Sequence, residues 1–470
     1  MPLPILNHHK IDASGPFIVE TDVDIPLTTA PQNTEYGVNI IRANIYRPKD
    51  SFTSGEKYPV LVTYGPYGKD IPYSDFQPQS FSELNPKYRS AHSAWETPDP
   101  AYWTSQGYAI VRADERGTGQ SPGKLDTMSA GTSEAFFDVV EWAATQPWSN
   151  GKVGLLGISY YAGSQWRVAA RKPKGLAAIV PWEGMSDYYR DRVRHGGILS
   201  NDFIGWINQY GLAGRKDRKW GLDTHEGTLS AEELERNRAD QTIDTAKNEY
   251  RDQEYYTSRD FNLEDIEVPI LSVANWGGIL LHLRSNVVGY LKAGSKLKYL
   301  RFITGRHDLP FFYEEEVKVQ QSFLDAFLKG KDTVGWSIPG KVQAVDLCLR
   351  KGDPGHNNAE AELATFPRRT ENEWPIKLTT YVDYHLSSSL VLSPKKDPTV
   401  STLRYEAPSG QLQFMSAPFE EESGITGHPS LTITTSLSSR DGSKPTDNDI
   451  FVTIHHYDSS GKEGKRLPYR

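Results

Sequence analysis

The chain has 470 residues, more than one ordinary core accommodates, so two or three domains are expected. Its net charge of −8 comes from interspersed acids and bases, so no nucleic-acid partner is expected. The single cysteine, Cys348, excludes an intrachain disulfide, and no apolar run is long enough to cross a membrane. These features predict a cytoplasmic protein that needs neither a metal nor another cofactor.

The first 185 residues carry two different strand patterns. Residues 16–28 and 37–48 alternate apolar and polar side chains, which predicts half-buried strands. Four continuous apolar runs follow, as expected of strands that are covered on both faces. Helical patterns separate the later runs, so the order of elements predicts a parallel sheet between two layers of helices. The four runs are 58–64, 108–114, 152–157 and 176–182, and the helices are expected over 133–146 and 161–173.

The middle of the chain interrupts this sheet. Residues 186–265 are charged and favour helix, which predicts a helical cap over a pocket. Buried-strand patterns resume at 268–275 and 297–305, and a final amphipathic helix over 314–330 is expected to end at Gly330. The core therefore has a first part, 1–185, and a second part, 266–370.

The C-terminal part, 371–470, has a third character. Four short alternating segments separated by Ser, Gly and Pro predict an all-antiparallel β-sandwich. The last of these segments ends close to Arg470, so the sandwich is expected to be truncated. Exposed strand edges would then favour a homo-oligomer. The four segments are 378–388, 401–408, 430–439 and 449–458.

The stretch GISYYAGSQW, residues 157–166, places Ser159 between a buried strand and a helix. A serine in such a turn stands at the top of the sheet, with the next helix N-terminus beside it, as a nucleophile requires. The usual elbow has a second glycine at the position of Tyr161. The alternative is a serine that only caps the helix.

Four features together resemble a family of serine hydrolases that includes X-Pro dipeptidyl peptidases, α-amino-acid ester hydrolases and bacterial cocaine esterase. They are the entry IRANIYRP, the segment DERGTGQSPG at 114–123, the run QPWSNGKVGLLGISYYAGSQW and the all-β C-terminal part. The resemblance implies an α/β-hydrolase core, a helical cap and a C-terminal jelly-roll-like domain.

The resemblance also implies the roles of several residues. The oxyanion donors would be the backbone N–H of Tyr160 and the hydroxyl of Tyr67, and the general base would be His307, in the loop after the last core strand. The family usually places its acid in a Gly-Trp-x-Asp segment, but here Gly278 occupies the position of the aspartate. Glu183, directly after the strand at 176–182, is our hypothesis for the acid, ahead of Asp187 and Asp308. The alternative role of Glu183 is that of a pocket carboxylate or of a salt-bridge partner. His282 is interpreted as a structural histidine, with a pocket residue as the alternative.

Aromatic residues around the serine predict a bulky or aromatic small-molecule substrate, and Trp166, Trp182 and Trp276 are the expected pocket residues. The expected reaction is hydrolysis of an ester or amide through an acyl-enzyme on Ser159. Three alternatives stay open: an acyl-transfer, cyclising or condensing enzyme of a biosynthetic pathway, an X-Pro dipeptidyl-peptidase-like aminopeptidase, and a non-catalytic binding protein.

Overall fold

The computed structural model describes residues 9–29, 39–200 and 230–463, except 238, 279, 280, 353, 356, 357, 408, 440 and 441. The chain divides into two compact units, residues 1–370 and 371–466; the last four residues, grouped with the first, are not described. No helix of the described ranges is long and apolar enough to cross a membrane.

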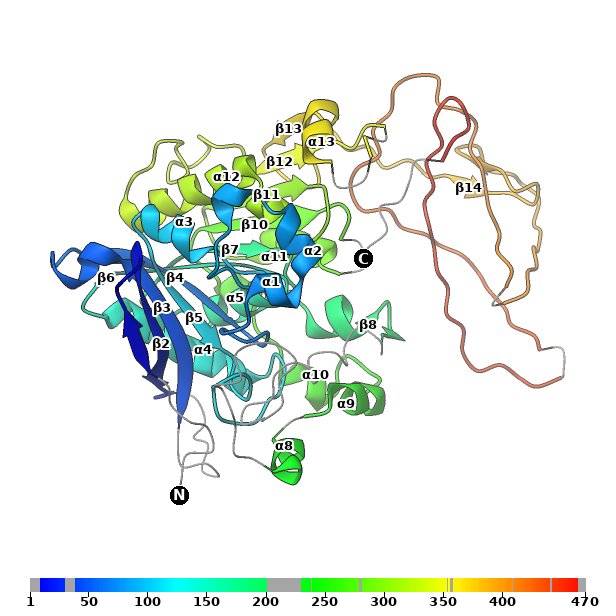
Figure 1. Cartoon of the computed structure of the whole chain (residues 1–470). Helices are drawn as coiled ribbons and strands as arrows, with labels where there is room; N and C mark the ends of the chain where they lie inside the picture. Colours follow the sequence, from blue (N-terminus) through cyan, green and yellow to red (C-terminus); the bar gives the residue numbers. More distant parts are fainter. Residues whose placement is uncertain are drawn as a thin grey trace. The chain divides into compact units, whose positions relative to one another are not determined.

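The first unit is built on an eleven-stranded mixed sheet, which runs through the middle of Figure 1. Its order is β1-β2-β3-β5-β4-β6-β7-β10-β11-β12-β13. Neighbours from β1 to β5 pair antiparallel, whereas those from β5 to β12 pair parallel. The strands are β1 (Lys10–Asp12), β2 (Phe17–Pro26), β3 (Ile40–Pro48), β4 (Tyr58–Gly65), β5 (Ala109–Asp114), β6 (Ser149–Ile158), β7 (Leu176–Trp182), β10 (Ile270–Asn275), β11 (Lys298–Ile303), β12 (Val345–Cys348) and β13 (Arg368–Glu371).

Helices cover both faces of this sheet, as its continuous apolar strands require (Figure 1). One core cluster packs the sheet against α4 (Ala130–Thr145) and α5 (Tyr160–Ala170). A second packs the opposite face against α3 (Pro100–Ser105) and α12 (Glu314–Leu324). Helix α11 (Leu283–Lys292) contacts β10 and β11.

The elements predicted for the core are confirmed within a few residues. Helix α4 begins a turn earlier than expected, because Ser129 rather than Ser133 is its N-cap and accepts a hydrogen bond from the N–H of Thr132. After α12 the chain makes one π-turn and stops at Gly330, whose left-handed backbone ends the helix as predicted.

The expected cap falls partly on residues 201–229, which lie outside the described part of the chain. Its described portions are short elements: a π-helical turn over Tyr189–Val193, the pair β8 (Arg194–His195) and β9 (Ile198–Leu199), α8 (Ala231–Arg236), α9 (Gln241–Lys247) and α10 (Glu254–Thr257). The first unit also contains the short α-helices α1 (Tyr73–Phe76), α2 (Pro78–Glu83) and α13 (Ala359–Thr365), and 3₁₀-helical turns over Lys49–Phe52, Pro86–Tyr88, Leu263–Asp265 and Pro310–Phe312.

The second unit contains less strand pairing than its alternating pattern predicts. Within its described residues, β14 (His385–Leu386) pairs with β15 (Leu392–Ser393), and two isolated bridges are formed. The other expected strand segments form no ladder there. Apolar side chains of these segments are also exposed; Phe451, for example, is 80% exposed, whereas a sandwich buries such side chains between two sheets.

Candidate active site

Ser159 lies in a sharp turn between β6 and α5. Its backbone has φ 60° and ψ −113°, a left-handed conformation that a residue other than glycine adopts only at a cost of about 1–3 kcal/mol. Two backbone hydrogen bonds fix the turn, from the Ser159 N–H to the carbonyl of Trp182 and from the Gly163 N–H to the carbonyl of Ser159. The strained turn brings the serine to the carboxyl edge of the parallel strands, as predicted.

Tyr161 replaces the second glycine of the usual elbow, and two other glycines make room for it. A Cβ on Gly65, at the end of β4, would lie 2.7 Å from Cε1 of Tyr161. A Cβ on Gly157 would lie 2.7 Å from Cβ of Tyr161. The elbow therefore accommodates a large side chain because the neighbouring strand ends have none.

The two expected oxyanion donors lie beside the serine. Tyr160 is the first residue of α5, where backbone N–H groups have no partner within the helix. Tyr67 follows β4 and packs against the rings of Tyr160 and Tyr161 at centroid distances of 6.3 and 5.5 Å. Burial raises the pKa of Tyr67 well above its ordinary value, while a hydrogen bond with Ser159 acts in the opposite direction. Tyr67 is thus a neutral hydroxyl within reach of the nucleophile.

The hydroxyl of Tyr160 is tied to a buried acid that follows β5. It donates to Oε1 of Glu115 over 2.7 Å, and Thr132 donates to the same oxygen over 2.8 Å. Burial raises the pKa of Glu115 to about 7, although both hydrogen bonds lower it. These bonds hold Tyr160, and with it the start of α5, against the end of β5.

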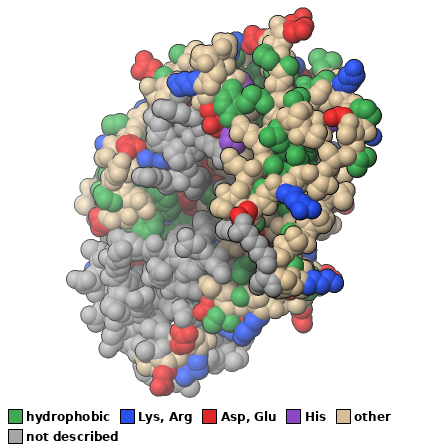
Figure 2. Space-filling model, turned by 90° about the vertical axis from the view of Figure 1, so that its right-hand side faces the viewer, with side chains coloured by type: hydrophobic (Ala, Val, Ile, Leu, Met, Phe, Trp, Pro, Cys, Tyr) green, Lys and Arg blue, Asp and Glu red, His purple; other side chains and the backbone are tan. Residues whose placement is uncertain are grey.

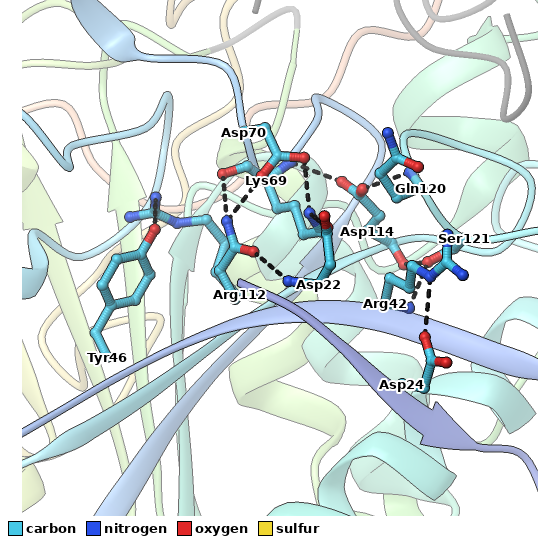
Figure 3. Close-up of polar contacts among 11 residues, drawn as sticks. Asp22, Asp24, Arg42, Tyr46, Lys69, Asp70, Arg112, Asp114, Gln120 and Ser121 are labelled. Atoms are coloured by element: carbon cyan, nitrogen blue, oxygen red, sulfur yellow. Dashed lines mark hydrogen bonds and ion pairs between the residues drawn. The ribbon is translucent and has the colours of Figure 1, made fainter. Parts of the chain in front are cut away.

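A buried polar cluster anchors the loop that carries Tyr67 (Figure 3). The ammonium of Lys69 pairs with Asp22 and Asp70, and its backbone N–H donates to Oδ1 of Asp114 over 2.6 Å. Asn44 on β3 accepts from the backbone N–H of Asp22 and donates to the carboxylate of Asp70. Burial lowers the pKa of Lys69, but Asp70, Asp114 and Asp22 together raise it above its ordinary value. The lysine is therefore a charged group two residues from Tyr67.

His307 follows β11 and faces Glu183, which follows β7. Nδ1 of His307 lies 2.8 Å from Oε2 of Glu183, and Asn275 donates to Oε1 of that carboxylate over 3.1 Å. A Cβ on Gly278 would lie 3.5 Å from Oε2 of Glu183. The missing side chain at residue 278 thus leaves space beside the carboxylate that faces the histidine. The placement agrees with the hypothesis that Glu183 supplies the acid.

Two residues at this edge were not assigned a functional position from the sequence. Nε2 of His282, just before α11, lies 3.3 Å from Oγ of Ser159, and Oε1 of Glu96 lies 3.2 Å from Nε2 of His307. His282 follows β10 in the chain, and its position after a strand could have indicated a role in the site. Glu96 precedes α3, so no strand end in the sequence points to it.

The expected tryptophan pocket needs correction. Trp166 and Trp182 are fully buried in the two core clusters, Trp166 against Gly289 of α11 and Trp182 against Phe311. Both side chains therefore belong to the packing of the sheet core. Trp276 stacks on Phe302 and donates from its indole to the carbonyl of Cys348.

Aromatic side chains do gather beside the serine, but they are mainly tyrosines. A third apolar cluster contains Tyr67, Tyr160, Tyr161 and Tyr188, with Trp95 packed against it. Within the described ranges, no group of three or more His, Cys, Asp or Glu side chains could hold a metal ion. One sheet edge thus brings together a serine, two histidines, two carboxylates and hydroxyl or amide donors. Nucleophilic acyl transfer requires groups of these kinds.

Sequence comparison matches both units to known domains. The model of the X-Pro dipeptidyl-peptidase (S15 family) matches residues 37–307. The model of the X-Pro dipeptidyl-peptidase C-terminal non-catalytic domain matches residues 342–468. The C-terminal part is therefore similar to the domain that accompanies this catalytic core.

Individual relatives are more distant. The chain is 29% identical over 196 residues to cocaine esterase from Rhodococcus sp. (strain MB1 Bresler), which covers 41% of this chain and 28% of the relative. It is 26% identical over 229 residues to an Xaa-Pro dipeptidyl-peptidase from Pediococcus pentosaceus, covering 38% of this chain and 28% of the relative. The matched stretches thus span under a third of these proteins.

Solved structures confirm the fold class. A CocE/NonD family hydrolase from Staphylococcus aureus matches with a TM-score of 0.66 and 25% identity, over 84% of this chain and 64% of that one. An α-amino acid ester hydrolase matches with a TM-score of 0.52 and 15% identity, over 82% and 64% of the two chains. The core is therefore an α/β-hydrolase fold, as the sequence predicted.

Proposed function

Because the chain belongs to the X-Pro dipeptidyl-peptidase (S15) family, we propose that it is a serine hydrolase that cleaves an ester or amide bond through an acyl-enzyme on Ser159. One observation carries the proposal: the strained turn after β6 places Ser159 at the sheet edge where His307 faces Glu183. A serine that only capped α5 would need neither feature, and its side chain accepts no capping hydrogen bond from the helix.

The proposed reaction uses each group in turn. Oγ of Ser159 attacks the substrate carbonyl while Nε2 of His307 takes its proton. Glu183 on Nδ1 keeps the histidine in the required tautomer and stabilises the imidazolium. The Tyr160 N–H and the Tyr67 hydroxyl donate to the oxyanion. The imidazolium then protonates the leaving group. Water attacks the acyl carbon while His307 takes its proton, and the histidine returns that proton to Oγ of Ser159 as the acid product leaves.

His307 is the better base of the two histidines, although His282 is the one within hydrogen-bond reach of Ser159. His307 has a carboxylate on Nδ1, whereas Nδ1 of His282 has no hydrogen-bond partner within the described residues. Burial, together with the charge of His307, lowers the pKa of His282 well below its ordinary value. An imidazole that cannot hold a second proton is a poor base, so we expect replacement of His307 to be the more damaging.

The proposed substrate is a small ester or amide with a bulky or aromatic group. The tyrosine cluster beside Ser159 supports this choice, since tyrosines provide apolar surface with a polar tip. An acyl-transfer, cyclising or condensing enzyme, and an X-Pro dipeptidyl-peptidase-like aminopeptidase, would use the same serine and differ in acceptor or substrate. A cytoplasmic location stays a prediction, which cell fractionation would test.

The test combines covalent labelling with turnover. We expect a fluorophosphonate to label the wild type and p-nitrophenyl butyrate to be hydrolysed, and Ser159→Ala to lose both signals. Ser164→Ala is the matched control, because Ser164 lies on α5 with its hydroxyl bonded to backbone carbonyls. Labelling without turnover of esters, X-Pro peptides or amides would favour acyl transfer to another acceptor. A wild type that neither labels nor turns over would leave the binding-protein alternative.

A further inference from the structure

His307 lies between two carboxylates, of which a catalytic triad uses only one. Glu183 is 2.8 Å from Nδ1, and Glu96 is 3.2 Å from Nε2, the nitrogen that must receive the serine proton. Both glutamates are buried, at 1% and 2% exposure. In the resting site, the reactive nitrogen of the proposed base therefore faces an acid.

Glu96 is built into the nucleophile turn. Its backbone has φ 60°, and its carbonyl accepts a hydrogen bond from the N–H of Ile158, the residue before Ser159. Oε2 of Glu96 is buried and has no hydrogen-bond partner within the described residues. The other oxygen, Oε1, lies 3.2 Å from Nε2 of His307, the distance of an ion pair, and a buried carboxylate is costly without an opposite charge nearby.

Ser159 is engaged elsewhere in the same resting site. Its hydroxyl lies 3.3 Å from Nε2 of His282, and the rings of His282 and His307 have centroids 5.8 Å apart. The hydroxyl of Ser159 thus contacts His282, and Nε2 of the proposed base contacts Glu96. Both partners are buried residues at the same sheet edge.

We infer that Glu96 is a positioning residue that holds Nε2 of His307 in the resting enzyme and sets the pH at which this histidine becomes available to Ser159. The inference rests on the proposed function. The proton balance is simple: an imidazolium held between the two carboxylates carries a proton on each nitrogen and accepts no other. One proton must leave Nε2 for solvent before Nε2 can take the proton of Ser159, whose Oγ then bonds to the substrate carbonyl carbon.

The charges around His307 agree with this role. Burial lowers the pKa of His307, but Glu183 and then Glu96 raise it, to a net value of about 10. Of the other groups that face the site, His282 is held neutral, because burial lowers its pKa and the charge of Arg192 acts in the same direction. Asp308, next in the chain, is paired with Arg306 over 2.6 Å.

The sign of the expected effect follows from the charge of Glu96. Removing a carboxylate lowers the pKa of His307, so more of the histidine is unprotonated at neutral pH. The ascending limb of the pH profile of kcat/KM must then move to lower pH. A residue with only a structural role would lower the rate at every pH and leave the limb in place.

The experiment is the pH profile of p-nitrophenyl butyrate hydrolysis by Glu96→Gln. We expect the ascending limb to move down by about 1–3 pH units, the effect of one nearby opposite charge. Glu314→Gln is the control for the same chemical change, because Glu314 is an exposed partner of Lys318, and its limb should coincide with that of the wild type. An unmoved limb in Glu96→Gln overturns the inference.

Two further measurements keep the test decisive. If circular dichroism shows that Glu96→Gln does not fold, Glu96→Asp serves instead. Its shorter side chain withdraws the carboxylate from Nε2, so the limb should move in the same direction, and an unmoved limb overturns the inference. Ser159→Ala separates the two proposals. If it retains turnover, the proposed function fails; if it is inactive while the limb is unmoved, only the role of Glu96 fails.

Discussion

The carboxylate that faces His307 comes from Glu183, which directly follows Trp182, the buried last residue of β7. Glu183 itself has φ 48°, a conformation that turns its side chain toward the loop after β11. We predict that Glu183→Gln lowers kcat by about 10⁴, because a neutral amide leaves His307 in the wrong tautomer without a charge to stabilise it. Steady-state hydrolysis of p-nitrophenyl butyrate measures the effect.

Gly278 offers a rescue that a purely structural role of Glu183 would not allow. A Cβ at residue 278 meets the carbonyl of Asn275 at 3.3 Å and Oε2 of Glu183 at 3.5 Å, so a small side chain nearly fits. Gly278→Asp alone should lower activity, since two carboxylates would compete for one histidine. The double variant with Glu183→Gln should recover part of the lost kcat. A double variant as inactive as Glu183→Gln would contradict the assignment.

At the level of residues, the sequence could indicate those side chains that follow a strand. Ser159, Glu183 and His307 each come directly after a predicted parallel strand or its short loop, so topology alone brings them to one edge. Glu96 does not follow a strand, and its position beside His307 depends on the conformation of the loop before α3. Trp166 and Trp182 were assigned to the pocket because aromatic residues are frequent in the sequence around Ser159, but the sequence does not show which face of α5 or β7 points into the core.

At the level of elements, the predictions were more accurate for the continuous apolar runs of the core than for the short alternating segments of the second unit. The continuous runs of β4 to β11 are buried on both faces, and a run of that kind has few other structures open to it. The second unit differs, because short alternating segments specify a strand only when another sheet face covers them. Val400, at 99% exposure, is an apolar residue in that unit with no such cover.

The loop after β4 depends on the Lys69 cluster, so its stability is an element-scale prediction. Lys69→Met leaves the carboxylates of Asp22 and Asp70 buried without their cation (Figure 3), which should cost about 3–5 kcal/mol in the free energy of unfolding. The displaced loop carries Tyr67, so kcat should fall more than KM changes. Urea unfolding and steady-state kinetics measure the two effects.

Lys318→Met is the control for the removal of one lysine charge. Lys318 is 67% exposed on α12, so its replacement should change the free energy of unfolding by less than about 0.5 kcal/mol. Equal losses in the two variants would show that the cluster around Lys69 contributes no more than a surface pair.

At the level of the whole molecule, the exposed apolar side chains of the second unit predict self-association. Phe451, Val452 and Ile454 are 80%, 61% and 62% exposed, and apolar side chains are also visible at the surface in Figure 2. Exposed apolar residues that lie close together in the chain favour contact with another copy. We therefore expect the weight-average mass in sedimentation experiments to rise above that of the monomer as the concentration increases.

Phe451→Ser combined with Ile454→Ser should abolish that rise, because the substitutions remove the apolar contact area without touching the core of the first unit. Phe52→Ser is the matched control, since Phe52 is 69% exposed in the first unit, and it should leave the concentration dependence unchanged. If the double variant still associates, the second unit is not the contact. If esterase activity is the same in monomer and oligomer, the whole reaction takes place in the first unit of a single chain, where Ser159, His307 and Glu183 all lie.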